Sequence, residues 1–230
     1  IEQINKAGGV DGKQLEGVVY DDACDPKQAV AVANLATKKV AFVAGHFCSS
    51  SSIPASQVYN ESGIVQITPA STNPRLTDEA AAKGWNNVFR TCGRDDAQGT
   101  VAGQWLARNY KGKKVAVIHD KSTYGKGLAD ETRKAMNAAG LTETVSESIN
   151  PGEKDYSALV SKLKDAGVEA VYFGGYHPEA GLILKQMGEQ GLNAKMLSGD
   201  SMNSAELWTI AGKAAENLIF TFAPEPRNVP

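Results

Sequence analysis

The sequence has little surplus charge and no long hydrophobic run, and each absence excludes a class of protein. Among 230 residues, 24 Lys and Arg stand against 26 Asp and Glu, which gives a formal net charge of −2. A protein that binds nucleic-acid backbones normally carries a basic surface instead. No stretch reaches the roughly 18 apolar residues of a membrane helix. The 42% hydrophobic content is that of an ordered globular chain, and we expect no nucleic-acid partner.

Recognisable catalytic and metal-binding motifs are also missing. No G-x-G-x-x-G follows an expected strand, and neither G-x-x-x-x-G-K-[ST] nor G-x-S-x-G occurs. The cysteines form no C-x-x-C pair, and no His/Cys spacing resembles a zinc site. His46 and Cys48 point to opposite faces of an extended segment, so they form no nucleophilic pair. We expect no metal, no cofactor and no enzyme, and these absences disfavour the alternative of a hydrolase-like or sugar-processing enzyme.

Only three cysteines are present, and two of them have comparable positions. Cys24 and Cys48 each follow an expected strand. They form either a disulfide or two buried free thiols. A disulfide would close a loop of about 25 residues and contribute about 3 kcal/mol in the chain-entropy model. Cys92 fits a small buried hydrophobe better than a nucleophile.

The chain alternates between strand and helix patterns throughout. Strands are expected at residues 14–20, 40–44, 64–67, 87–90, 114–119, 142–149, 169–173, 195–197 and 217–222. Helices are expected at residues 1–7, 26–38, 51–60, 95–110, 125–139, 156–166, 178–190 and 203–211. Asp25 and Pro26 are preferred residues for a helix start, and Gly140, Gly167 and Gly191 for helix ends. The alternation predicts an α/β fold with parallel sheets and right-handed crossovers.

Polar residues gather where the strands are expected to end, which is where open α/β sheets bind ligands. Residues 45–52 and 68–72 offer hydroxyls and helix-start N–H groups without Lys or Arg, which suits a small carboxylate. Later strand ends offer Tyr124, Tyr176 and Asp200. Together these groups fit a zwitterion with a small apolar side chain. Alternatively, the serines are helix caps, the tyrosines pack the surface, and Asp200 caps the helix that begins near Asn203.

Several motifs resemble one family over essentially the whole chain. They are YDDACDPKQAVAVAN at 20–34, GHFCSSS at 45–51, ITPAST at 67–72, IHDK at 118–121 with YG at 124–125, PGEKDYS at 151–157 and GGYHPE at 174–179. These strings resemble the Leu/Ile/Val-binding proteins, which are periplasmic substrate-binding components of branched-chain amino-acid ABC transporters.

The resemblance implies the class I periplasmic-binding-protein fold, with two doubly wound parallel-sheet lobes, a hinge and an interlobe cleft. Residues 1–93 would form lobe one, without its N-terminal strand, and residues 94–221 would form lobe two. Residues 222–230 would cross back to lobe one through the hinge. The chain would then be a fragment that binds weakly or not at all alone and exposes apolar sheet edges.

The resemblance also implies residue roles. Ser49, Ala70 and Thr72, with Ser71 between the last two, would hold the ligand α-carboxylate and ammonium. Asp200 would pair with the ammonium, and relatives there often carry the longer Glu. Tyr124 and Tyr176 would close over the ligand, and Phe47 and Cys48 would form an apolar wall beside its side chain. Cys24 and Cys48 would form a disulfide.

The function implied is capture of an aliphatic, branched-chain-type amino acid in the periplasm and delivery to the membrane permease of an ABC importer. The full-length protein would be a monomer. Residues 90–96 look more like relatives that take small or unusual amino acids such as GABA. The alternative is a sensory ligand-binding domain of the same fold for an amino acid or a GABA-like ligand.

Overall fold

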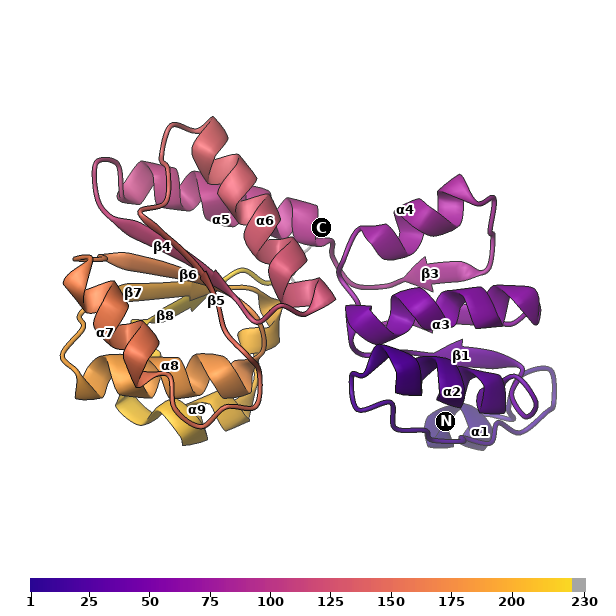
Figure 1. Cartoon of the computed structure of the whole chain (residues 1–230). Helices are drawn as coiled ribbons and strands as arrows, with labels where there is room; N and C mark the ends of the chain where they lie inside the picture. The colour runs from indigo at the N-terminus through magenta and orange to yellow at the C-terminus, as the bar shows by residue number, and fades with distance from the viewer. Residues whose placement is uncertain (225–230) are drawn as a thin grey trace.

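The computed structural model describes residues 1–224, which fold around two parallel sheets (Figure 1). We call the elements around the first sheet the first lobe and those around the second sheet the second lobe. The first sheet has the strand order β1-β2-β3, and the second has the order β5-β4-β6-β7-β8. All pairs in both sheets are parallel, so the predicted α/β class with parallel sheets is confirmed.

The two lobes follow one another along the chain. The first lobe comprises α1 (Glu2–Lys6), α2 (Pro26–Ala36), β1 (Phe42–Ala44), α3 (Ser49–Glu61), β2 (Val65–Thr68), α4 (Arg75–Ala82) and β3 (Val88–Arg90). The second lobe comprises α5 (Asp95–Asn109), β4 (Val115–His119), α6 (Thr123–Ala138), β5 (Val145–Ser148), α7 (Ser157–Asp165), β6 (Ala170–Gly174), α8 (His177–Glu189), β7 (Lys195–Ser198), η1 (Asp200–Met202), α9 (Ala205–Ala211), η2 (Gly212–Asn217) and β8 (Leu218–Phe220).

The first lobe packs α2, α3 and α4 on one face of its sheet. The Asp25 side chain accepts a hydrogen bond from the N–H of Gln28 at 2.7 Å and Pro26 opens α2, as the sequence predicts. The opposite face leaves Phe42, Ile67 and Phe89 exposed by 52%, 37% and 47%. The apolar surface exposed here is thus a face of the sheet, whereas the expectation concerned its edges.

The second lobe has helices on both faces of its sheet, with α5 and α6 on one side and α7, α8 and α9 on the other (Figure 1). Alternate residues of β4 explain this, because Val117 packs toward the first pair of helices and Ile118 toward the other group. A Cβ at Gly99 or Gly103 would collide with α6, so these glycines allow α5 to pack closely against it.

Helix ends follow the predicted glycines. After α6, Gly140 adopts a φ of +85°, and the N–H of Leu141 donates to the carbonyl of Met136 at 3.1 Å. Such a left-handed residue closes the last helical turn, and a glycine takes it without a Cβ penalty. Gly167 and Gly191 have φ values of +70° and +67° after α7 and α8.

Three expectations are corrected or fall outside the described residues. Residues 14–20 form no strand: they lie beside no described strand of the first sheet, in which β1 pairs only with β2. The short helix α4 was not expected from the sequence. The final strand ends at Phe220, and residues 225–230 of the expected return crossing at 222–230 lie outside the described part of the chain.

Candidate functional site

A cleft of about 920 Å³ lies between the two lobes and takes its lining from both. Seven of the nine side chains that the resemblance assigns to a ligand are part of this lining: Phe47, Ser49, Ala70, Thr72, Tyr124, Tyr176 and Asp200. Cys48 and Ser71 lie behind it, with side chains that are almost completely buried. The fold thus gathers residues that are up to 153 positions apart between Phe47 and Asp200.

The first-lobe wall of the cleft offers hydrogen-bond donors without a cation. Ser49 is the first residue of α3, where helix N–H groups have no partner within the helix and the dipole is positive. Its Oγ accepts from the N–H of Asn73 at 3.2 Å, which leaves the hydroxyl hydrogen for another acceptor. The buried Thr72 hydroxyl lies beside the Asp95 carboxyl, whose pKa it lowers, and within residues 1–224 it makes no other hydrogen bond. This wall suits a carboxylate.

The four serines at 49–52 lie within α3 and are not its cap. The residue before α3 is Cys48, and its side chain makes no capping bond. Ser52 instead donates to the carbonyl of His46 at 3.2 Å and meets Ser71 Oγ at 2.7 Å. Ser71 supports the loop from behind rather than facing the cleft.

The loop that carries Ala70 and Thr72 is held by its own hydrogen bonds. Thr68 Oγ1 accepts from the N–H of Ala70 at 3.2 Å and from that of Ser71 at 3.0 Å. The Arg90 guanidinium donates to the carbonyls of Ser71 at 2.7 Å and Asn73 at 2.8 Å. A loop fixed in this way loses little conformational freedom when a ligand binds.

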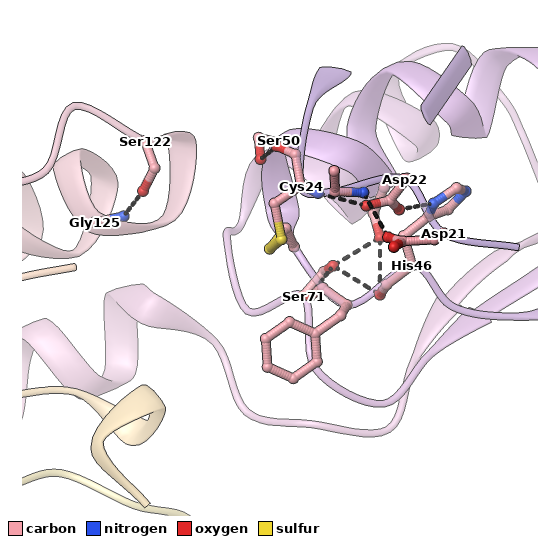
Figure 2. The surroundings of a disulfide bond; sticks show 12 residues. Asp21, Asp22, Cys24, His46, Ser50, Ser71, Ser122 and Gly125 are labelled. Carbon is pink, nitrogen blue, oxygen red and sulfur yellow. Dashed lines mark hydrogen bonds and ion pairs between the residues drawn. A yellow bond between two sulfur atoms is a disulfide. The ribbon is translucent and has the colours of Figure 1, made fainter. Parts of the chain in front are cut away.

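A disulfide joins Cys24 to Cys48, with 5.4 Å between their Cα atoms, as the resemblance implies (Figure 2). Nearby, Asp22 accepts from the N–H of Cys24 at 2.8 Å and contacts His46 Nδ1. Burial opposes ionisation of Asp22, but the hydrogen bonds from His46 and Cys24 keep its pKa below the usual value. His46 Nε2 lies 2.9 Å from the Tyr59 hydroxyl, and burial raises the pKa of Tyr59 to about 12. These bonds fix the segment from which Phe47 reaches the cleft.

The second-lobe wall presents an acid beside two aromatic rings. Asp200 lies in η1, and its Oδ1 accepts from the Tyr124 hydroxyl at 3.0 Å and from Gln98 Nε2 at 2.8 Å. The Tyr124 and Tyr176 rings lie 5.1 Å apart between centroids. Burial and then the charge of Asp200 raise the pKa of Tyr124, so its hydroxyl remains a donor at neutral pH. Among the described residues, no group donates to Asp200 Oδ2, so this oxygen is free for a cation.

Asp200 does not serve as the cap of the following helix. That position belongs to Ser204, whose Oγ accepts from the N–H of Glu206 at 3.2 Å. The alternative role for Asp200 is thus excluded. Its placement in the cleft is consistent with ligand contact, which stays a prediction.

Much of the remaining cleft lining is apolar, and it includes Val101, Trp105, Leu197 and Phe220.

Within residues 1–224, no three His, Cys, Asp or Glu side chains gather closely enough to hold a metal ion. In that same span, no helix combines the length and the hydropathy needed to cross a bilayer.

Comparison with known families covers the whole chain. A sequence model of the family described as "Periplasmic binding protein" matches residues 1–230. The chain belongs to the periplasmic binding protein family. The Leu/Ile/Val-binding protein homolog 1 of Brucella suis is 55% identical over 231 residues, which cover all of this chain and 61% of that relative. A Pseudomonas aeruginosa relative, named as a leucine-, isoleucine-, valine-, threonine-, and alanine-binding protein, is 51% identical and covers 99% of this chain and 61% of its own length.

Solved structures of periplasmic binding proteins share the fold. The leucine-binding protein LivK of Thermotoga maritima matches with a TM-score of 0.85 at 28% identity, covering 99% of this chain and 64% of that protein. LivJ of Streptococcus pneumoniae, solved with isoleucine, has a TM-score of 0.84 at 28% identity, covering 95% of this chain and 62% of that protein. The resemblance to Leu/Ile/Val-binding proteins and the class I fold are confirmed. This chain spans about 61% of the length of its curated relatives.

Two site residues of this periplasmic binding protein escaped the sequence analysis. Gln98, in the first turns of α5, binds Asp200, and Thr221, just after β8, donates to Gln98 Oε1 at 2.8 Å. Both follow carboxyl ends of strands, β3 and β8, where the rule for open sheets predicts ligands. In the sequence, however, Gln98 stands inside a predicted helix eight residues after Arg90, and no local pattern distinguishes it from an exposed helix residue.

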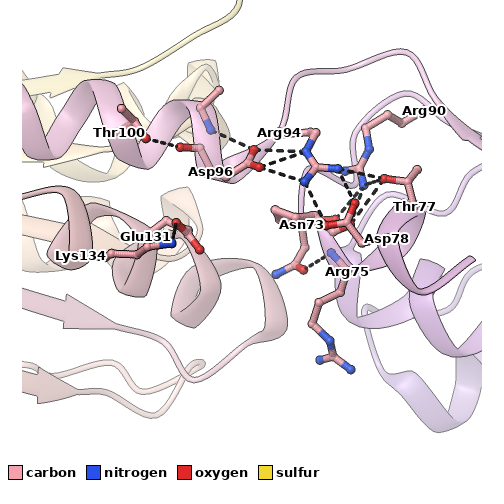
Figure 3. A network of polar contacts seen from close by, with 12 residues as sticks. Asn73, Arg75, Thr77, Asp78, Arg90, Arg94, Asp96, Thr100, Glu131 and Lys134 are labelled. Carbon is pink, nitrogen blue, oxygen red and sulfur yellow. Dashed lines mark hydrogen bonds and ion pairs between the residues drawn. The ribbon is translucent and has the colours of Figure 1, made fainter. Parts of the chain in front are cut away.

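An ionic network crosses the junction between the two lobes of this periplasmic binding protein (Figure 3). Arg94 precedes α5 and donates to both carboxylate oxygens of Asp78 on α4, at 2.7 and 3.0 Å. The same guanidinium donates to Asp96 on α5 at 2.9 Å. The hydrogen bonds from Arg94 hold the pKa of Asp78 and of Asp96 below the usual value. Arg94 therefore joins a first-lobe helix to the first helix of the second lobe.

Proposed function

We propose that the protein captures an aliphatic, branched-chain-type amino acid between its lobes and delivers it to the permease of an ABC importer in the periplasm. The names of the Brucella and Pseudomonas relatives and the isoleucine bound to LivJ support this substrate class. We further propose a binding role without catalysis, a monomeric full-length protein, and no nucleic-acid partner. The lobes would comprise residues 1–93 and 94–221, with residues 222–230 returning to the first lobe.

The observation that carries the proposal is the opposition of charge across the cleft. The first-lobe wall has the N-terminus of α3 and the hydroxyls of Ser49 and Thr72, which attract an anion. The second-lobe wall has Asp200, whose Oδ2 is free for a cation. A ligand that satisfies both walls carries a carboxylate and an ammonium, and its side chain meets apolar lining such as Phe47.

Binding would shift the protein toward a closed form. The first lobe holds the carboxylate, and hinge motion brings Tyr124, Tyr176 and Asp200 over the ligand. The hydrogen bond from Asn73 Nδ2 to the carbonyl of Thr123, at 2.9 Å, already links the two lobes. The closed form would be the one that the permease engages.

Calorimetric titration of the complete gene product that contains residues 1–230 tests this function. We expect heat of binding with leucine, isoleucine or valine, with alanine and GABA as further ligands to compare. 4-Methylpentanoate lacks the ammonium and isopentylamine lacks the carboxylate, so neither should compete with leucine at equal concentration. Absence of binding by every amino acid, from protein that unfolds cooperatively, would exclude the proposal.

Replacing Ser49 with alanine should weaken leucine binding by about 1–3 kcal/mol, because the ligand carboxylate loses a buried hydroxyl donor. Titration of both proteins with leucine measures the difference. Ser50→Ala is the matched control, since the Ser50 hydroxyl donates to the carbonyl of Cys24 at 3.1 Å and lies outside the cleft lining. Equal affinity of the Ser49 variant and the native protein would remove this hydroxyl from the site.

A further inference from the structure

The side-chain amide of Gln98 connects three parts of the second lobe that are distant in sequence. Its Nε2 donates to Asp200 Oδ1 at 2.8 Å. Its Oε1 accepts from the N–H of Asp200 at 3.2 Å and from the Thr221 hydroxyl at 2.8 Å. The amide thus contacts both the backbone and the carboxylate of one residue, and its orientation is fixed because the donor and acceptor ends face different partners.

This amide also determines which carboxylate oxygen a ligand can use. Asp200 Oδ1 receives hydrogen bonds from Gln98 and from the Tyr124 hydroxyl, whereas no described group donates to Oδ2. Two donors on one oxygen restrict rotation of the carboxylate about its Cβ–Cγ bond. A ligand ammonium would therefore meet a carboxylate that is already oriented, and binding would cost less conformational freedom.

Gln98 is placed where the chain passes between the lobes. It lies in the first turn of α5, four residues after Arg94, while Thr221 directly follows β8. Any movement of the segment after β8 would therefore act on the amide that holds Asp200. The helix itself has separate anchors, because Arg94 binds Asp78 and Gly103 packs against α6.

We propose that Gln98 is a positioning residue that orients the Asp200 carboxylate for the ligand ammonium and ties it, through Thr221, to the segment that follows β8. This inference rests on the proposed capture of an amino acid. Gln98 acts through Asp200, so its loss should lower affinity without unfolding α5.

The test compares leucine titrations of the complete gene product as native protein, Gln98→Met and Gln98→Glu. Methionine keeps the length of the side chain and removes all three of these hydrogen bonds. We expect affinity to fall about 10- to 100-fold, the range for hydrogen bonds to charged groups. Gln104→Met is the matched control, because Gln104 lies on the same helix and is exposed. It should bind as the native protein does.

The Gln98→Glu variant separates positioning from a merely structural role. A glutamate here faces Asp200, Asp95 and the Tyr124 hydroxyl, and when ionised it cannot donate to Asp200 Oδ1. Once protonated, its hydroxyl donates as the amide did. Relative to native protein at the same pH, we expect weak binding at pH 8 and at least fivefold recovery at pH 5, whereas Gln98→Met should not recover.

Each outcome decides the inference. Gln98→Met affinity within threefold of native protein would overturn it and leave the proposed function intact. A Gln98→Glu deficit that is equal at both pH values would also overturn it, since the donated hydrogen would not be the cause. If native protein binds no amino acid, the proposed function fails, and the role of Gln98 in ammonium binding fails with it.

Discussion

Replacing Asp200 with asparagine should weaken leucine binding at least 100-fold. Removing one partner of a desolvated ion pair costs about 3–5 kcal/mol, because the other charge is left without its counterion. Asparagine keeps the size of the side chain, and its carbonyl oxygen still accepts from Gln98 and Tyr124. Its amide nitrogen would then face the ligand ammonium at the place of Oδ2, so two donors would oppose one another.

Titration with leucine near pH 7 measures this effect. Asp165→Asn is the matched control, because it removes the same charge from an exposed position on α7. Its affinity should equal that of the native protein. If Asp200→Asn bound leucine within fivefold of the native value, Asp200 would not pair with the ammonium. The second-lobe wall would then give no support for a zwitterionic ligand.

The second large effect concerns Asp95, the first residue of α5. Its side chain is completely buried, and its Oδ2 has no partner among the described residues. Burial, and then the nearby charge of Asp200, raise the pKa of Asp95 to about 7, although contact with Thr72 and the charge of Arg90 act in the opposite direction. The folded protein therefore holds a proton here that the unfolded chain releases near pH 3.9.

The sign of the pH dependence follows from this difference. The protonated carboxyl contributes its full stability below about pH 3.9, and the contribution falls as the pH rises through 7. Between pH 5 and pH 8, we expect Asp95 to cost the native protein about 3 kcal/mol of unfolding free energy. Asp95→Asn should remove this loss, since an amide does not titrate.

Urea unfolding at pH 5, 6, 7 and 8 checks the prediction as the difference between native protein and Asp95→Asn. Asp96→Asn is the control on the next residue. Its hydrogen bond from Arg94 lowers the Asp96 pKa, so its contribution is lost only as the pH falls below the usual range. That variant should differ from native protein by a constant amount over these four pH values. A constant difference for Asp95→Asn as well would show that Asp95 does not titrate in this range.

Local sequence patterns predicted most of the secondary structure, because helix and strand formation depends largely on residues that are close in sequence. Continuous apolar strands such as Val115–His119 and helix starts such as Asp25-Pro26 form for reasons contained within a few residues. The strand predicted at residues 14–20 was wrong, because a local pattern does not show whether a strand has a neighbour with which to pair. The eight-residue helix α4 was missed because its sequence has too few turns to show a clear period.

The candidate site was only partly predictable. The strand-end rule and the family resemblance identified Ser49, Thr72 and Asp200, which the fold brings to one cleft. They also selected Cys48 and Ser71, because sequence position does not reveal which side of a loop a side chain occupies. In the structure, Ser71 donates backward to the carbonyl of Phe47 at 3.0 Å, and Cys48 joins the disulfide.

The sequence by itself determined the α/β class, the family and the chemical character of the two cleft walls, because strand alternation, motifs and strand-end residues are properties of short segments. Only the tertiary structure decided that Gln98 holds Asp200 and that Asp95 is buried without a full set of partners. Gln98 lies 102 positions from Asp200 and 123 from Thr221. Contacts over such separations depend on strand order and on how α5 packs against α6, which no local pattern encodes.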